Sequence, residues 1–533
     1  MSISKIHEEK GKKVLMVHDK PFIMFSGEVR NSNSSSVEYM ERVWDKADKL
    51  EMNSLLLPVS WAMVEPEEDV FDFALVDGLI EQARRRGKKI GLLWFGAWKN
   101  AQCYYAPEWV KTNLERFKRA EMVKGKRFVN LEQFHGMPYT TLSYLCEETK
   151  KADAKAFSEF MKHLKKVDGQ ENTVVIVQVE NETGVMGSPR ENSDQADVLF
   201  VGDVPHEFAA YMKANTKTME ADVKAAVESG KPFGSWKEVF GEAAEEIFSA
   251  YHIASYVNHV ASAGKDVYPL PLVANCWLDK GAKAGYYPSG GPVARVMEIW
   301  KYCAPSIDII APDIYVPNFC EVCDQYVKLN NPLFIPETAT HSYAGLRQVY
   351  VVGHYHALCY APFSFENMGE EFTAIQGYLF GMDTADPALK TPQDPDEYSW
   401  YTKTLNDMMP LLTDKYGTAD LQAVISERKE QDTMIFGEYG FKAVMNSPIL
   451  KKKSGVCLAL RLSENEFYLI ASGCIIVPFS ASKEKPHIDV LRLEDGCFAN
   501  GAWKMNRRLN GDEVAGMRYE SPVLLKIKLF VYN

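Results

Sequence analysis

The sequence predicts a parallel α/β barrel followed by an antiparallel β-domain, and three observations favour this fold class. Short apolar runs alternate with helix-like segments over about the first 390 residues, which is the pattern of βα units around a parallel sheet. Eight such runs can be counted, the number that closes a (β/α)₈ TIM barrel. Beyond residue 414 the runs alternate in polarity and are separated by turn residues, as in a β-sandwich.

The predicted barrel strands are continuous apolar runs, which suit strands buried on both faces. They are expected at residues 21–28, 54–61, 89–96, 174–182, 271–277, 307–313, 332–337 and 356–363. Apolar residues at helical spacing predict helices at about residues 36–50, 74–86, 152–166 and 398–412. Ser36 is the expected N-cap of the first of these helices.

The expected division of the chain has three parts. A β-hairpin at residues 1–20 leads into a catalytic barrel at residues 21–414, which is interrupted by a helical insertion at about residues 205–263. The β-domain occupies residues 415–533. Its strands are expected at residues 456–462, 467–471, 474–479, 488–493 and 523–531.

Composition excludes several classes of function. The chain has 533 residues, of which 46% are hydrophobic, enough for a large core. Its net charge of −12 favours neither nucleic acid nor an anionic membrane as a partner. The sequence has no run of 18 apolar residues and no signal-peptide pattern at its start, so we expect a cytoplasmic protein without membrane contact. Its ten scattered cysteines are typical of reduced thiols.

No cofactor is expected. Cys320 and Cys323 form the only C-x-x-C pair, and a zinc or redox site would need a second pair or a thioredoxin-like context. Histidine and acidic residues show no metal-ligand spacing, and no glycine-rich phosphate loop follows a predicted strand.

Two glutamates end predicted strands on opposite sides of the barrel. Glu182 ends the fourth strand and Glu337 ends the seventh, at the barrel face where such enzymes keep their chemistry. Two opposed carboxyls about 5–5.5 Å apart are what a retaining glycosidase uses, one as nucleophile and the other as acid and base. The nucleophile must stay ionised, and Tyr315 at the end of the sixth strand is placed to donate a hydrogen bond to it.

Other residues near the strand ends are weaker candidates. Trp94, Trp98, Trp277 and Tyr105 could stack on sugar rings or pack in the core. Glu180 precedes Glu182 by two positions, so it points the same way, one layer deeper. His341 is expected at the rim. The complete set of expected substrate-binding residues is Asn181, Tyr315, Trp98, Asn100, Trp277, Glu65 and Asn275.

These residues resemble a known family. Residues 178–182, Gln-Val-Glu-Asn-Glu, are similar to the acid/base motif of glycoside hydrolase family 35, a clan A family of β-galactosidases, and residues 26–28, 61–66 and 70–73 match it too. The resemblance implies Glu182 as acid/base, Glu337 as nucleophile and Asn181 as a ligand of the sugar 2-hydroxyl. It covers most of the barrel, and the β-domain suits the accessory sandwich of such enzymes.

The sequence also departs from this family. The Cys-Ala-Glu-Trp segment that helps such enzymes to recognise galactose is replaced by Gly-Ala-Trp-Lys-Asn at residues 96–100, and Glu337 lies in Pro-Glu-Thr. Together with Pro-Ser-Gly-Gly-Pro at residues 288–292, this resembles a divergent bacterial branch with traits of family 42.

The expected activity is therefore retaining exo-cleavage of a terminal β-linked sugar, most simply galactose, from an oligosaccharide or other glycoside. A β-glucosidase, a transglycosylase acting on β-glucans such as β-1,2-linked ones, and a sugar-binding protein on a degenerate barrel stay open as alternatives. The sequence also leaves open whether the protein assembles into a homo-oligomer.

Overall fold

The computed structural model describes residues 2–131, 137–373, 376–377, 390–499 and 501–533. Its centre is a sheet of eight parallel strands in the order β4-β13-β12-β11-β10-β9-β6-β5. Glu28 bridges Leu56 on one side and Phe363 on the other, which closes the sheet into a barrel. The strands are β4 (Met24–Phe25), β5 (Ser54–Ser60), β6 (Lys89–Phe95), β9 (Val174–Val179), β10 (Leu272–Trp277), β11 (Ile309–Ile314), β12 (Phe334–Thr338) and β13 (Cys359–Pro362). The predicted fold class is confirmed.

Helices surround the barrel and bury their apolar faces against it. In α1, Met40, Val43, Trp44 and Ala47 are buried, and the Ser36 side chain caps the first turn, as predicted. The longer helices are α1 (Val37–Lys49), α3 (Ala74–Arg85), α5 (Glu147–Asp168), α10 (Ala244–Lys265), α11 (Met297–Cys303), α12 (Phe319–Tyr326), α13 (Ala344–Tyr350) and α16 (Pro395–Lys415). Shorter elements are α2 (Trp61–Val64), α4 (Glu108–Thr112), β7 (Val129–Asn130) and β8 (Pro138–Tyr139). No helix in the described ranges has both the length and the apolar character of a membrane span.

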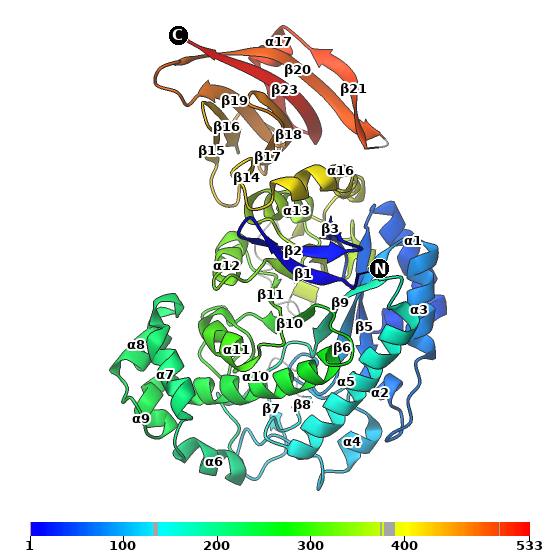
Figure 1. Cartoon of the computed structure of the whole chain (residues 1–533), viewed down its shortest axis with the longest axis vertical. Helices are drawn as coiled ribbons and strands as arrows, with labels where there is room; N and C mark the ends of the chain where they lie inside the picture. The colour runs from blue at the N-terminus through cyan, green and yellow to red at the C-terminus, as the bar shows by residue number, and fades with distance from the viewer. Residues whose placement is uncertain (1, 132–136, 374–375, 378–389, 500) are drawn as a thin grey trace.

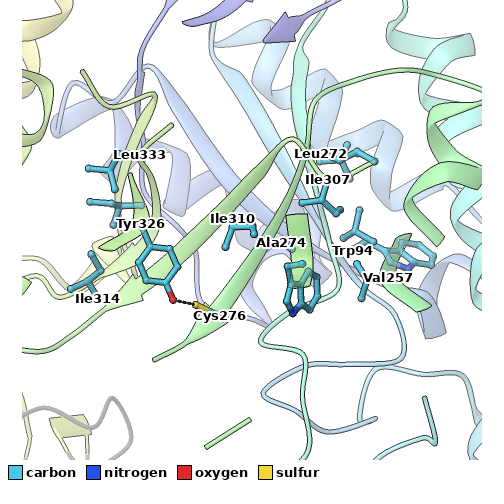
Figure 2. Close-up of a cluster of buried hydrophobic side chains, with 14 of the residues drawn as sticks. Trp94, Val257, Leu272, Ala274, Cys276, Ile307, Ile310, Ile314, Tyr326 and Leu333 are labelled. Carbon is cyan, nitrogen blue, oxygen red and sulfur yellow. Dashed lines mark hydrogen bonds between the residues drawn. The ribbon is translucent and has the colours of Figure 1, made fainter. Parts of the chain in front are cut away.

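Part of the core fills the space between the strands and their covering helices. Figure 2 shows side chains of β10 and β11 meeting Val257 from α10 and Tyr326 from α12. The Tyr326 hydroxyl and the Cys276 sulfur form a hydrogen bond of 2.8 Å within this apolar layer. The contact fixes α12 against β10. It therefore helps to hold in place the loop after β10 and the loop between β11 and α12.

The helical insertion differs from the predicted one. It consists of α6 (Asp194–Val201), α7 (His206–Ala214), α8 (Ala221–Ser229) and α9 (Trp236–Phe240), which project from one side of the barrel (Figure 1). The helix α10 belonged to the insertion predicted at about residues 205–263, but it packs along α5. Its amphipathic face is therefore part of the barrel wall, and the insertion begins earlier in the chain.

The N-terminal segment closes one end of the barrel. It forms three antiparallel strands, β1 (Lys5–Glu9), β2 (Lys12–Val17) and β3 (Lys20–Phe22), where the sequence predicted a two-stranded hairpin. Leu15 and Val17 of β2 belong to the same apolar cluster as Leu56, Val175 and Ile309 of the barrel strands. This plug leaves the carboxyl ends of the strands as the accessible face.

The C-terminal region contains two antiparallel sheets with a core between them, and Figure 1 places it at one end of the molecule. The six-stranded sheet has the order β14-β17-β18-β23-β20-β21 and the four-stranded sheet β15-β16-β19-β22. The elements are β14 (Leu421–Ile425), β15 (Gln431–Phe436), β16 (Tyr439–Met445), β17 (Val456–Arg461), β18 (Glu466–Ser472), β19 (Cys474–Ser480), β20 (His487–Ala499), β21 (Ala502–Leu509), α17 (Asp512–Ala515), β22 (Arg518–Tyr519) and β23 (Val523–Tyr532).

A buried ion pair joins this region to the barrel. Arg347 of α13 donates two hydrogen bonds of 2.8 and 2.6 Å to the carboxylate of Glu427, which follows β14. The His341 ring lies 3.0 Å from the same guanidinium and is fully buried. His341 is thus a residue of the interface between the two regions, and not the rim residue that the sequence predicted.

Candidate active site

A cavity of about 240 Å³ opens at the carboxyl ends of the barrel strands. Carboxylate, amide, ammonium, hydroxyl and aromatic groups contribute to its wall. It is lined by Asn31, Lys99, Asn100, Glu182, Trp277, Leu278, Lys280, Asp313, Tyr315, Glu337 and Phe363. This is the barrel face on which enzymes of this fold carry their active sites.

Glu182 reaches the cavity from an unusual backbone turn that follows β9. Glu180 and Glu182 have φ angles of +62° and +47°, a left-handed conformation that side-chain-bearing residues seldom adopt. The amide of Glu182 donates a 3.1 Å hydrogen bond to Asn275 Oδ1 on β10, and Ala101 N donates to the Glu182 carbonyl at 3.0 Å. Such strain persists only where surrounding contacts enforce it, and it is concentrated at functional sites.

Glu337 lies within β12, and its carboxylate enters the cavity from the side opposite β9. The Tyr315 hydroxyl donates a hydrogen bond of 2.7 Å to Glu337 Oε2, which is the contact that the sequence analysis expected. Oε1 of Glu337 has no hydrogen-bond partner within the described part of the chain and is buried. One oxygen is therefore held in place while the other is available to a bound molecule.

The carboxylates of Glu182, Asp313 and Glu337 each place an oxygen within 4.8 Å of the others. Carboxyl groups this close to one another raise each other's pKa, because two neighbouring negative charges repel. The same three oxygens could also hold a metal ion. Lys99 already supplies a positive charge at this cluster.

Lys99 is a buried cation among these acids. It is 5% exposed, its ammonium donates a 3.0 Å hydrogen bond to Asn181 Oδ1, and it lies 4.9 Å from the centre of the Phe95 ring. Burial opposes its charge, but the nearby carboxylates, with Glu337 and Glu182 first, raise its pKa. Lys99 therefore stays protonated and partly neutralises the site.

The acidic groups differ in protonation. Burial, followed by the charge of Glu337, raises the pKa of Glu182 to about 7, and Lys99 opposes this rise. Burial and Glu337 also raise the pKa of Glu28 and of Asp313 well above the usual range, so both hold a proton more readily than a solvated carboxyl does. Glu182 can thus hold or release a proton at neutral pH, as a general acid and base must.

A second pair of acids supports the loop that follows β6. Burial and the neighbouring Asp153 raise the pKa of Glu180 well above its usual range, and burial also raises the pKa of Asp153. Glu180 Oε2 accepts a 2.8 Å hydrogen bond from Trp98 N, and Asp153 accepts hydrogen bonds from Trp94 and Tyr256. These contacts fix the backbone that carries Lys99 and Asn100.

Five of the seven expected substrate-binding residues lie in the cavity wall or directly behind it. Asn100, Trp277 and Tyr315 line the cavity. Asn181 and Asn275 are buried behind it, where they hold Lys99 and the Glu182 backbone. Asn181 keeps a buried Nδ2 without a partner in the described ranges.

Trp98 and Glu65 do not line the cavity, contrary to the sequence prediction. The Trp98 ring is fully buried and packs edge-on against Tyr256 at 4.9 Å. The Glu65 carboxylate accepts hydrogen bonds from Trp61 Nε1 and Asp69 N, both shorter than 3.0 Å, so it anchors the loop after α2. Trp94 and Tyr105, the other two possible stacking residues, do not line the cavity either. Trp94 packs on Phe157 and Phe160, and Tyr105 on Phe95.

Several cavity residues carry no sequence signal of their own. Asn31 and Lys280 lie in loops, and Lys99 belongs to the segment at residues 96–100 that departs from the family pattern. The one available signal for Lys99 was its position directly after the third barrel strand, next to Asn100. A lysine in a loop is usually solvated, so its burial could not be expected.

Two family models match parts of the chain. Residues 32–221 match the glycoside hydrolase family 42 model, described as β-galactosidase, and residues 401–519 match a domain of unknown function, DUF5597. The first match includes Glu182 and ends before Glu337. It supports a glycosidase. No curated protein matches the sequence.

Solved structures with similarity to this chain include three β-galactosidases. The β-galactosidase from Rahnella sp. R3 is 14% identical with a TM-score of 0.41. The match covers 64% of the present chain and 50% of the Rahnella chain. The β-galactosidase from Marinomonas ef1 is 11% identical with a TM-score of 0.46. The match covers 74% of the present chain and 61% of the Marinomonas chain. The β-galactosidase from Bacillus circulans sp. alkalophilus is 10% identical with a TM-score of 0.46. The match covers 95% of the present chain and 99% of the Bacillus chain. The chain therefore spans half of the first protein's length and 61% of the second's, and no functional assignment follows from scores this low.

Proposed function

We propose that this protein is a retaining exo-β-glycosidase. The observation that carries the proposal is the pair of buried carboxylates on β12 and after β9, which face one cavity in different environments. Glu337 accepts a hydrogen bond from Tyr315, whereas burial and the charge of Glu337 raise the pKa of Glu182 to about 7. Two carboxyls that differ in this way suit the nucleophile and the acid of double displacement.

In the first step Glu337 attacks the anomeric carbon while Glu182 donates its proton to the departing oxygen. The ester that forms removes the negative charge of Glu337, and this charge is one cause of the raised pKa of Glu182. The pKa of Glu182 therefore falls, and Glu182 can take a proton from water in the second step. That water attacks the same carbon and releases Glu337. Asn181, which the family resemblance implies as a ligand of the sugar 2-hydroxyl, lies behind the cavity and would act by holding Lys99 in place through its 3.0 Å hydrogen bond.

The shape and chemistry of the cavity support cleavage of a terminal sugar. Its volume of about 240 Å³ is below the range of about 300–1,000 Å³ that is usual for drug-sized ligands, and the barrel beneath it is filled. Asn100 Oδ1, Asp313 Oδ1 and Glu337 Oε1 are buried without hydrogen-bond partners in the described ranges, so they can bind sugar hydroxyls. Trp277 offers an apolar surface.

A β-galactoside is the first candidate substrate, and relationships to glycoside hydrolase families 35 and 42 are both compatible with the residues present. A panel of nitrophenyl β-galactoside, β-glucoside, β-fucoside and β-xyloside identifies the sugar. NMR of the first-formed product should show the β-anomer. An initial α-anomer would contradict retention. Binding of sugars without cleavage of any member would favour a sugar-binding protein, and transfer to an added sugar acceptor would favour a transglycosylase.

The pH dependence of kcat/KM should reveal the role of Lys99. Because Glu182 must be protonated to act as an acid, activity should fall as the pH rises through about 7, the pKa of Glu182. Lys99 lowers this pKa, so Lys99→Met should move the alkaline limb to higher pH, whatever its effect on the maximal rate. Lys526→Met in the β-domain is the control and should leave the profile unchanged. An alkaline limb that stays in place in Lys99→Met would show that Lys99 does not act on the acid.

A further inference from the structure

A second cavity of about 330 Å³ adjoins the one just described. Its wall comes from the loop after β10, the loop after β11 and the start of α12. Leu278 and Lys280 line both cavities, so these two residues separate neighbouring spaces. The second cavity is open to the outside and is larger than the first.

The second cavity lies on the side of Glu182. Its shared residues follow β10, the strand next to β9 in the barrel, and Asn275 of β10 holds the Glu182 backbone. The Lys280 ammonium is near enough for its charge to act on the Glu182 carboxyl. A molecule that extends from Glu182 towards solvent along this side therefore meets the second cavity.

The lining combines apolar surface with available amides. Val293, Val316 and the Tyr326 ring contribute apolar surface. The side-chain amides of Asn318 and Gln325 also face this space, and neither makes a hydrogen bond within the residues that the structure describes. Asp279 and Lys280 add one charge of each sign to the wall, so its formal charges cancel. A neutral ring with hydroxyl groups at its edge and an apolar face suits this combination of groups.

We propose that this second cavity is the leaving-group subsite and that it binds a second sugar ring. The inference rests on the proposed function, in which the leaving-group oxygen receives its proton from Glu182. The rest of the leaving group must then extend from Glu182, and the cavity entered past Leu278 and Lys280 adjoins that point. Asn318 and Gln325 donate to and accept from the ring hydroxyls, while the apolar residues contact the ring face. The natural substrate is accordingly at least a disaccharide.

The test compares two substrates that share the cleaved sugar. These are lactose and methyl β-galactoside if the enzyme cleaves galactosides, or cellobiose and methyl β-glucoside if it cleaves glucosides. The double variant Asn318→Ala/Gln325→Ala should lower kcat/KM for the disaccharide about ten- to a hundredfold, because each lost hydrogen bond to a neutral group costs several-fold. The methyl glycoside, whose leaving group is too small to reach the amides, should react as with the wild type.

Two further variants sharpen this test. Asn318→Trp fills the cavity and should produce the same selective loss on the disaccharide. Gln170→Ala changes an exposed glutamine in the turn before β9, at the opposite face of the barrel, and should affect neither substrate.

The possible failures are distinguishable. Equal losses on both substrates, or an unchanged rate on the disaccharide, would overturn the subsite while leaving the glycosidase assignment intact. Failure of the wild type to cleave any glycoside would overturn both.

Discussion

Replacement of Glu337 by glycine is expected to abolish turnover of every glycoside that the wild type cleaves. The Tyr315 hydroxyl holds the Glu337 carboxylate in the cavity by a hydrogen bond of 2.7 Å. Without this carboxylate no glycosyl ester can form. Loss of a covalent nucleophile lowers kcat by many orders of magnitude, about 10⁶-fold in a well-studied protease. We expect a fall of at least about 10⁴-fold, measured with the best nitrophenyl substrate.

Chemical rescue separates this role from a structural one. Azide can occupy the space left in Glu337→Gly and attack the anomeric carbon directly, so the product should be the α-glycosyl azide, with inverted configuration. Glu337→Gln should be equally inactive but not rescued. Glu191→Gln is the matched control, because Glu191 is also a buried glutamate, 2% exposed, and lies outside the cavity. Substantial activity in Glu337→Gly without azide would refute the assignment.

The Glu182→Ala variant is expected to show the second largest effect, and its size should depend on the leaving group. A positioned general acid contributes about 10²–10⁴-fold, so kcat/KM for a disaccharide should fall by about that factor. A dinitrophenyl glycoside needs little protonation of its leaving group, and its kcat/KM should fall far less. The deglycosylation step also lacks its base, so the glycosyl-enzyme should accumulate and appear as a burst of dinitrophenol.

Azide should act on this variant too, but with the opposite stereochemistry. It would attack the glycosyl-enzyme from the side that water normally uses, giving the β-glycosyl azide with retained configuration. The alkaline limb of the pH profile, which reports the pKa of about 7 of Glu182, should also disappear. A uniform loss across leaving groups would instead assign Glu182 a structural role.

The barrel could be predicted from the sequence because its strands are buried on both faces. Five of the six residues at 174–179 are apolar, with Gln178 as the exception, and all six are buried in β9, so the pattern and the environment agree. The two glutamates followed from the same logic, since a carboxylate at the carboxyl end of such a strand must lie at the barrel mouth. The hydrogen bond from Tyr315 to Glu337 could be expected for the same reason, because Tyr315 lies at the carboxyl end of the neighbouring strand.

The partner that each polar side chain takes in the folded chain was not accessible in this way. Glu65 follows a barrel strand closely, but its carboxylate is taken up by Trp61 and Asp69 within its own loop. Lys99 is buried only because carboxylates from several strands converge on it. Strand β21 was missed for another reason: most of its residues are exposed, so it lacks the alternation that marks a strand packed on a core.

The interface between the barrel and the sheets has a consequence for how the chain can be divided. Leu458 and Ile470 of the six-stranded sheet belong to the same apolar cluster as the barrel helices. Truncation after α16 would remove Glu427 and leave the Arg347 guanidinium, 1% exposed, without its counter-charge. The same cut would also uncover the apolar side chains that this cluster buries, each of which contributes about 1.5–3 kcal/mol when fully buried, against the 5–15 kcal/mol that keeps a protein folded. The C-terminal region is therefore no interchangeable module, because it shares a buried apolar cluster and an ion pair with the barrel helices.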